Sequence, residues 1–360
     1  MSDSGKIGRQ EPADFSDTMH KLVTIQYLRA IAATAVLVFH AGERFGYSFT
    51  AGAYGVDLFF VISGFLMVAI TNDETQPGKF LQDRIQRIVP IYWLATSVLV
   101  IGAFLGLFPN MKLEWWHTIA SYLFLPAPSP VIDQTWPVLI PGWTLNYEMF
   151  FYAIFAALLF LRGALLRVVS LSVILLGLVM VAPLTGISSP ALAFYADNIV
   201  LEFVFGAWIG LAWKMRLSWE KVPPNVVLAL GAVLFIAAAS SASELPRSIL
   251  YGVPSALLLA GMLAHEARGK PREIASLELL GDASYSIYLW HGLAVSVAAM
   301  IVSKLGLPAL VGFVLSIIGG IIGGVISYWI VERPVTNFFR RRRKAKAALQ
   351  STDAPKNAEV

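Results

Sequence analysis

Ten long apolar runs, separated by short polar segments, dominate this chain. A helix of about 20 apolar residues is long enough to cross the roughly 30 Å hydrocarbon core of a bilayer. Since 57% of the residues are hydrophobic and only 14% are charged, lipid must be the solvent for most of the surface. The sequence therefore predicts an all-α polytopic integral membrane protein with about ten transmembrane helices. The runs occupy residues 22–41, 54–71, 88–108, 144–161, 167–185, 192–213, 225–243, 248–265, 284–303 and 307–331.

Two apolar segments need separate interpretation. The first run, 22–41, is too long for the core of a signal peptide and no small-residue cleavage site follows it, so we expect an uncleaved anchor. The segment 115–125 is apolar but too short to span, so it is expected to lie at the membrane interface or to re-enter.

The distribution of lysine and arginine predicts the orientation. The polar segments on the same side as the two termini carry 22 of the 27 Lys and Arg residues, whereas the loops on the other side carry four. Because these residues concentrate in cytoplasmic loops, both termini are expected in the cytosol. The predicted domains are a cytosolic tail at 1–21, a transmembrane domain at 22–335 and a basic, polar cytosolic tail at 336–360.

Arg29 and His40 are the first candidate functional residues. They lie eleven residues apart in one apolar run, which is almost three helical turns, so both side chains lie on one helix face, about 16 Å apart along the axis. An arginine at the bilayer centre costs roughly 2.5–3.5 kcal/mol, so Arg29 is expected to face protein or water. The small residues Ala32 and Ala33 between them leave room for a slender molecule. The alternative is a snorkelling arginine and an interfacial histidine without a shared role.

Six short motifs follow in order along the chain. They are QYLR at 26–29, GVDLFFVISGF at 55–65, the basic segment 80–92, WTLNYE at 143–148, SYSIYLWH at 284–291 and VERP at 331–334. Together they resemble the membrane acyltransferase-3 family over about residues 20–335. The opening of the first run is similar to the branch of that family that acetylates exopolysaccharides such as succinoglycan.

This resemblance implies a function. It predicts a membrane O-acyltransferase, with acetyl favoured as the acyl group, in the inner membrane of a bacterium. The donor would be cytosolic acetyl-CoA or another acyl-CoA, and the acceptor a hydroxyl of an exopolysaccharide or other surface glycan. Association with the polysaccharide-biosynthesis machinery is also expected. The alternative is a polytopic transporter or flippase of a lipid-linked sugar, but we find no internal repeat of the kind many transporters have.

His40, Asp57 and Glu148 are the predicted catalytic residues. A histidine beside a carboxylate can deprotonate a hydroxyl, because the carboxylate fixes the tautomer and stabilises the imidazolium. Glu148 is favoured as the partner of His40, since it lies deeper in an apolar run than Asp57. Alternatively, Asp57 is a polar helix-start residue, and Glu148 forms a structural ion pair, for instance with Arg29. Whether His40 acts as a base or is transiently acylated stays open.

The predicted donor-binding residues lie in three motifs besides Arg29. Arg84 and Arg87 belong to a segment, 80–88, that is expected to form an interfacial helix, where they would bind the phosphates of coenzyme A or lipid headgroups. Arg333 precedes a helix-stopping proline, and its charge either contacts the donor or pins the terminus.

Tyr288 and His291 share a polar stripe with Ser284 at helical spacing. They either line a donor channel or form hydrogen bonds between helices. The chain has no cysteine and no paired histidines at metal-ligand spacing, so neither a metal nor a permanently bound cofactor is expected. The basic run at 340–346 is expected to contact anionic lipid, and no nucleic-acid binding is expected.

Overall fold

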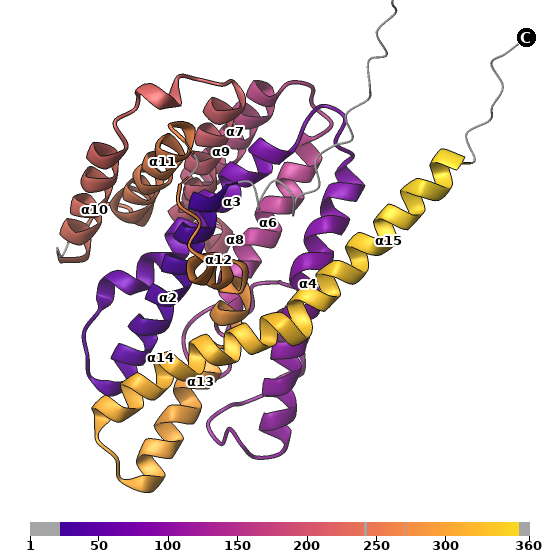
Figure 1. Ribbon diagram of the computed structural model, residues 1–360. Coiled ribbons are helices and arrows are strands. Elements are labelled where there is room, and N and C mark those ends of the chain that lie inside the picture. The colour runs from indigo at the N-terminus through magenta and orange to yellow at the C-terminus, as the bar shows by residue number, and fades with distance from the viewer. Residues whose placement is uncertain (1–21, 241–242, 270, 353–360) are drawn as a thin grey trace, which may run out of the picture.

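A computed structural model describes residues 22–240, 243–269 and 271–352, and within these ranges all regular structure is helical. Each of the ten predicted apolar runs overlaps a helix of at least 14 residues, although several of these helices begin or end outside the run (Figure 1). The predicted tail at 1–21 lies outside the described residues. The long helices are α2 (Val23–Phe45), α3 (Gly55–Ile70), α4 (Pro77–Phe104), α6 (Gly142–Leu158), α7 (Ala164–Val181), α9 (Leu201–Lys214), α10 (Pro224–Ser240), α11 (Val253–Ala267), α13 (Ser284–Leu305) and α14 (Ala309–Ser327).

Shorter helical segments connect these long helices. The 3-10 segments are η1 (Thr50–Tyr54), η2 (Ala182–Thr185), η3 (Asn198–Val200) and η4 (Trp219–Lys221), and the π-helical segments are η5 (Ser248–Gly252) and η6 (Tyr328–Glu332). The short α-helices are α5 (Trp115–Tyr122), α8 (Pro190–Tyr195) and α12 (Ala275–Asp282), and α15 (Arg333–Thr352) ends the described chain.

Length and composition support a multi-pass membrane protein. Seven helical segments of the described chain are long and apolar enough to cross a membrane, while α6, α9 and α10 are shorter. Two thirds of the apolar windows of α2 and α3 are buried, whereas only 22% of that of α7 is buried. We therefore place α2 and α3 at the centre and α7 against lipid. The predicted count of ten spans and the predicted orientation stay predictions.

Close packing of α3 against α9 depends on two glycines. A Cβ atom on Gly64 would overlap the Phe203 carbonyl oxygen, and one on Gly206 would overlap the Val61 carbonyl oxygen. Small residues let the backbones of membrane helices approach closely, because no side chain separates them. This contact fixes α9 on the central helix α3.

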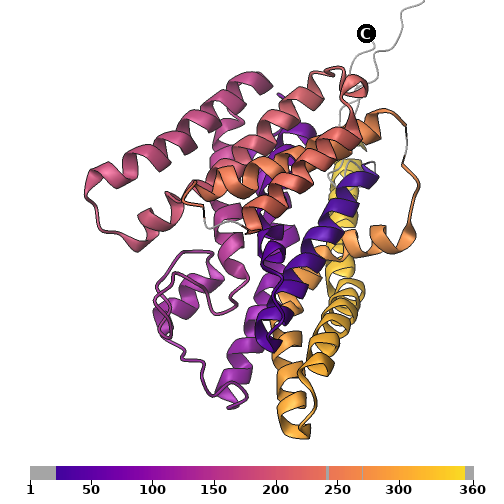
Figure 2. The same ribbon diagram turned by 90° about the vertical axis from the view of Figure 1, so that its left-hand side faces the viewer.

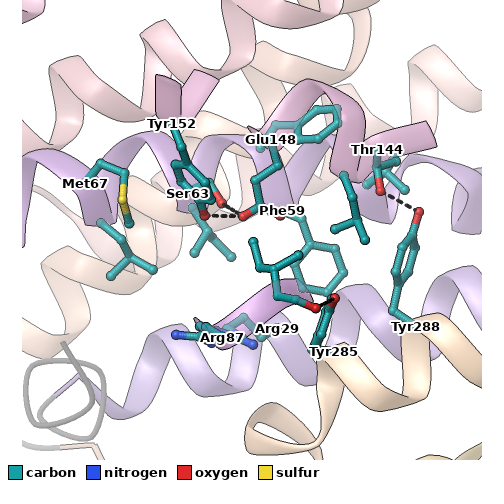
Figure 3. Close-up of a pocket in the computed structure, with 16 residues that line it drawn as sticks. Arg29, Phe59, Ser63, Met67, Arg87, Thr144, Glu148, Tyr152, Tyr285 and Tyr288 are labelled. Atoms are coloured by element: carbon teal, nitrogen blue, oxygen red, sulfur yellow. Dashed lines mark hydrogen bonds between the residues drawn. The ribbon is translucent and has the colours of Figure 1, made fainter. Parts of the chain in front are cut away.

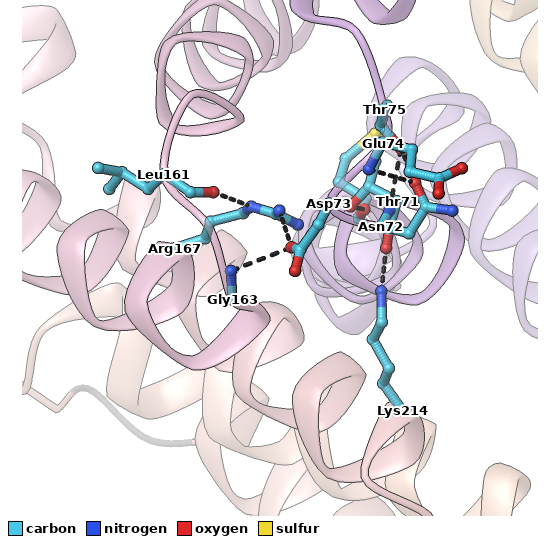
Figure 4. A network of polar contacts seen from close by, with 10 residues as sticks. Thr71, Asn72, Asp73, Glu74, Thr75, Leu161, Gly163, Arg167 and Lys214 are labelled. Carbon is cyan, nitrogen blue, oxygen red and sulfur yellow. Dashed lines mark hydrogen bonds and ion pairs between the residues drawn. The ribbon is translucent and has the colours of Figure 1, made fainter.

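One end of the bundle is tied together by a polar network that joins three helices (Figure 4). The buried guanidinium of Arg167, near the start of α7, pairs with Asp73 in the α3–α4 connection. Asp73 also accepts a hydrogen bond of 3.0 Å from the Gly163 amide, and Lys214 at the end of α9 donates to the Thr71 carbonyl oxygen. Three segments that were predicted to share one side of the membrane thus meet. We call this the Asp73 end, and the opposite one the His40 end.

The sequence predicted an interfacial helix at 80–88, but the structure has no separate helix there. It belongs to α4, which continues without a break from Pro77 to Phe104 and accommodates Pro90 in its interior. Phe80 and Ile88 are buried, but Ile85 is 44% exposed, so the expected apolar face is divided between protein and surroundings. The local sequence pattern is that of an amphipathic helix, but it carries no information about the neighbouring helices that bury Phe80 and Ile88.

Helix α15 continues from α14 through the π-helical segment η6 and leaves the bundle (Figures 1 and 2). It passes α4, where Arg343 forms an ion pair with Asp83. The predicted basic tail is therefore helical from 336 to 352, and 353–360 lie outside the described residues.

We expect Asp73→Asn to destabilise the folded protein, because the buried charge of Arg167 would lose its counterion. The Gly163 amide and, to a smaller extent, Arg167 lower the pKa of Asp73. This stabilisation is present above the ordinary aspartate pKa and is lost as the pH falls through the lowered value. The unfolding midpoint in detergent should fall by several degrees at neutral pH. The exposed neighbour Glu74 provides a control, and an Asp73→Asn midpoint equal to that of Glu74→Gln would refute the role of this ion pair.

Candidate active site

A cavity lies between α2, α3, α4, α6 and α13, and it holds about 750 Å³ of empty space, part of which is open to the surroundings. It follows α3 from Met67 to Val56, which corresponds to about 16 Å along the helix axis. Most of its wall is apolar, and its polar groups include Arg29 and Arg87 on one side and Glu148 on the other (Figure 3). This shape suits a long, thin molecule with a few polar groups.

Glu148 is held on the cavity wall by two hydroxyl groups. The Ser63 hydroxyl donates a hydrogen bond of 2.9 Å to Glu148 Oε1, and the Tyr152 hydroxyl donates to the same oxygen. Ser63 belongs to α3, while Tyr152 follows Glu148 by one turn of α6. The carboxylate therefore links α3 to α6 and presents its charge to the cavity.

Arg29 is buried, as expected for a charge inside a membrane helix, and it lines the same cavity. Its Nε and Nη2 atoms donate hydrogen bonds of 3.1 and 2.9 Å to the Ser284 hydroxyl on α13. Ser284 lies at the start of the predicted polar stripe, so this stripe does face the interior. Arg29 forms no ion pair with Glu148.

The rest of the stripe leads from the cavity to His40. Tyr288 lines the cavity and shares a hydrogen bond of 3.0 Å with the Thr144 hydroxyl. Its ring centroid lies 5.6 Å from that of His291, which in turn stacks on His40 with centroids 4.9 Å apart. His291 Nδ1 bonds the Tyr288 carbonyl oxygen, which can only accept, so Nδ1 carries the proton. Aromatic rings thus connect the cavity to His40.

His40 does not pair with either predicted carboxylate. Its Nδ1 lies 3.3 Å from an oxygen of Glu43, three residues further along α2. Asp57 and Glu148 are both engaged elsewhere, so the favoured pairing with Glu148 is corrected. The side chain of His40 is 42% exposed, so it is accessible from the His40 end. As predicted, Arg29 and His40 belong to one continuous helix, α2.

Asp57 is fully buried and bonded to Arg247, which precedes η5. Arg247 Nε donates to Asp57 Oδ1 at 2.9 Å, and Nη2 donates to Oδ2 at 2.8 Å. The carboxyl group of Glu202 on α9 lies close to this pair. Both oxygens of Asp57 are bonded to Arg247, and His40 lies beside Glu43 instead, so Asp57 anchors Arg247 in this arrangement.

Two other predicted residues lie away from the cavity wall. Arg84 is buried, with its guanidinium carbon 5.9 Å from the centroid of the Phe80 ring and 6.0 Å from that of the Tyr152 ring. Arg333 is exposed and lies over the Trp329 ring at 4.2 Å. Of the predicted donor-binding residues, Arg29, Arg87 and Tyr288 line the cavity, and His291 adjoins it through Tyr288.

Several residues of the site were not predicted. Glu43 and Tyr152 lie three and four residues from His40 and Glu148, so helical spacing could have indicated both. Glu202 is an acidic residue inside an apolar run, which is itself a functional signal in a membrane protein. Arg247 carried no local signal, since its partner Asp57 is 190 residues away.

The sequence profile of the acyltransferase-3 family, described as an acyltransferase domain, matches residues 22–331. This chain therefore belongs to the acyltransferase-3 family, as its motifs predicted. It is an O-acyltransferase and a multi-pass membrane protein.

Curated relatives agree with this assignment. The exopolysaccharide production protein ExoZ of Rhizobium meliloti is 44% identical over 85% of this chain and 96% of its own length. The peptidoglycan O-acetyltransferase OatA of Listeria monocytogenes is 23% identical over 87% of this chain, which spans 55% of that relative. No solved structure matches the chain.

Proposed function

We propose that this enzyme transfers an acyl group, acetyl in the first instance, from cytosolic acyl-CoA to a hydroxyl of a surface glycan outside the cytosol. The cavity that leads from Arg87 towards the His291–His40 pair carries this proposal. The similarity to ExoZ and OatA favours an exopolysaccharide or related glycan as acceptor and an acetyl group as cargo. The bacterial inner membrane is the matching location, where the enzyme would work beside the polysaccharide-biosynthesis machinery.

The two ends of the cavity suit the two substrates. Arg87 and Arg29 lie towards the Asp73 end, where cationic groups can bind the phosphate or amide oxygens of the donor. The pantetheine arm would then lie along α3 between apolar walls, and the thioester would reach the neighbourhood of Tyr288. The positive-inside distribution supports a cytosolic Asp73 end, because 22 of the 27 basic residues are on that side of the predicted topology.

His40 is the proposed general base. Glu43 near Nδ1 favours the tautomer that leaves Nε2 free to accept the proton of an acceptor hydroxyl. The hydroxyl oxygen attacks the thioester carbonyl carbon, the carbon–sulfur bond breaks, and the proton held by His40 passes to the departing sulfur. Glu148 and Ser63 would meet polar atoms of the donor arm in the middle of the cavity. The donor roles of Arg84, His291 and Arg333 stay predictions.

We expect His40→Ala to lower the rate of acyl transfer by about 10²–10⁴-fold, because the hydroxyl would lose its base. Transfer of radiolabelled acetyl to glycan, measured on purified protein at matched levels, is the readout. Glu43→Gln should cause a smaller loss in kcat, since the amide still bonds the ring but does not stabilise its cation. His265→Ala is the control, because this exposed histidine lies on α11. Near-normal transfer by His40→Ala would exclude the proposed role.

Arg87→Gln is expected to raise the KM for acetyl-CoA by about tenfold or more while kcat changes little. Charge-assisted contacts with phosphate contribute to donor binding, and this contribution is present before the chemical step. Arg162→Gln provides a matched control, because Arg162 is exposed in the α6–α7 connection at the same end. A fall in kcat with an unchanged KM would show that Arg87 is not a donor anchor.

The reaction is expected to join substrates on opposite sides of a membrane. The protein is reconstituted in sealed liposomes of known orientation, with acetyl-CoA on the face carrying the C-terminus. De-O-acylated oligosaccharides, from the surface polysaccharide of cells that carry this protein, are supplied only on the other face. Acetylated oligosaccharide should form without leakage of donor. Product that appears only when both substrates share one face would refute the transmembrane reaction.

A further inference from the structure

A cluster of aromatic rings surrounds Arg247 at the His40 end, and the acyl-transfer chemistry described above leaves it unused. The guanidinium carbon lies 5.5 Å from the centroid of the Tyr54 ring and 5.9 Å from that of the Trp143 ring. Trp143 directly precedes Thr144, which lines the cavity. The cluster therefore adjoins the part of the cavity where the thioester would meet an acceptor.

Arg247 is held in a fixed orientation. Its bidentate bond to the fully buried Asp57 fixes the plane of the guanidinium, and the Tyr54 ring beside it stacks on Tyr251. A planar arginine fixed in this way loses little side-chain entropy when it binds a ligand. The cluster is thus preorganised before any ligand arrives.

Two hydrogen-bond donors of the cluster are unused. Arg247 bonds Asp57 through Nε and Nη2, which leaves Nη1, and the indole Nε1 of Trp143 has no partner within the described part of the chain. Neither nitrogen is enclosed by protein. The Trp143 ring is partly exposed, and the side chain of Arg247 is 33% exposed. Both donors are therefore accessible to a bound molecule.

The charges around Arg247 indicate which kind of molecule the cluster would bind. Asp57 compensates the guanidinium, and the carboxyl group of Glu202 lies close by, so the cluster has no excess positive charge. An anionic ligand would gain little there. An uncharged ligand with oxygen acceptors and an apolar face would satisfy both donors and pack against the aromatic rings. A neutral sugar residue has this chemistry.

We propose that Trp143 and Arg247 form a binding subsite for an uncharged sugar residue of the acceptor glycan. The inference rests on the proposed function, because it assigns the acceptor end of the same site. The subsite would hold the sugar beside the cavity mouth, so that one of its hydroxyl groups can reach His40. Asp57, predicted as catalytic, then acts as a positioning residue through Arg247.

Saturation-transfer difference NMR on the full chain in phosphatidylcholine nanodiscs tests this subsite. The probes are the de-O-acylated oligosaccharides described above, separated by anion exchange into neutral and acidic fractions. Saturation should reach protons of the neutral oligosaccharides and be lost in Trp143→Ala. Trp143→Phe keeps a ring but removes the N–H, so the affinity should fall about fivefold. Trp116→Ala, at an exposed tryptophan of α5, is the control and should bind like wild type.

If Trp143→Ala does not fold, a second variant still tests the subsite. The double substitution Asp57→Asn with Arg247→Gln keeps a neutral hydrogen-bonded pair but removes Nη1, and it should also weaken binding about fivefold. In transfer assays, Trp143→Phe should raise the acceptor KM and leave the donor KM unchanged. This split between the two KM values would not arise from general loosening of the fold.

Several outcomes would overturn the subsite. The subsite is refuted if Trp143→Phe and the double variant both bind as tightly as wild type. It is also refuted if the protein prefers the acidic fraction, or if saturation reaches phosphocholine and not the sugar. Failure of the proposed function has a different signature. A wild-type protein that binds the neutral fraction through Trp143 but transfers no acetyl from acetyl-CoA would refute the acyl-donor assignment and leave the subsite intact.

Discussion

A charged side chain inside a membrane helix is stable only when it has a polar partner, because lipid offers none. This requirement links several helices of the bundle to one another. Arg29 joins α2 to α13 through Ser284, and Glu332 joins η6 to α13 through Ser286. Asp57 joins α3 to the segment before α11 through Arg247. The polar groups that are available for chemistry therefore also connect elements that are distant in sequence.

Glu148 illustrates how one residue serves both needs. Its carboxylate receives two hydroxyl donors from different helices, yet it still faces a cavity with two arginines on the opposite wall. The walls in between are apolar, so the few charges interact more strongly than they would in water. Such a cavity can hold a flexible polar arm in one orientation. The interior of the bundle is thus organised along α3 rather than around a single catalytic cluster.

The sequence predicted what depends on local pattern. Apolar length predicted the helices, and helical spacing placed Arg29 and His40 on one helix face, because both are properties of a single segment. Pairings between segments were less accessible. The favoured partner of His40 was Glu148, whereas the structure has Glu43 there, and Arg247 was counted only as a loop charge. Contacts between distant residues follow from packing, which the pattern of a single sequence does not reveal.

The unequal lengths of the helices have a consequence for the surrounding lipid. Helix α9 has 14 residues and is therefore about 21 Å long, well short of a typical hydrocarbon core. Helix α4, with 28 residues, is about twice that length. The apolar part of α4 begins only after Arg87, so the hydrophobic mismatch comes from the short α9, and it favours a locally thinned bilayer beside that helix. The activity of this protein should accordingly respond to acyl-chain length in the host membrane, and a thick bilayer would strain the same α3–α9 contact that Gly64 and Gly206 allow.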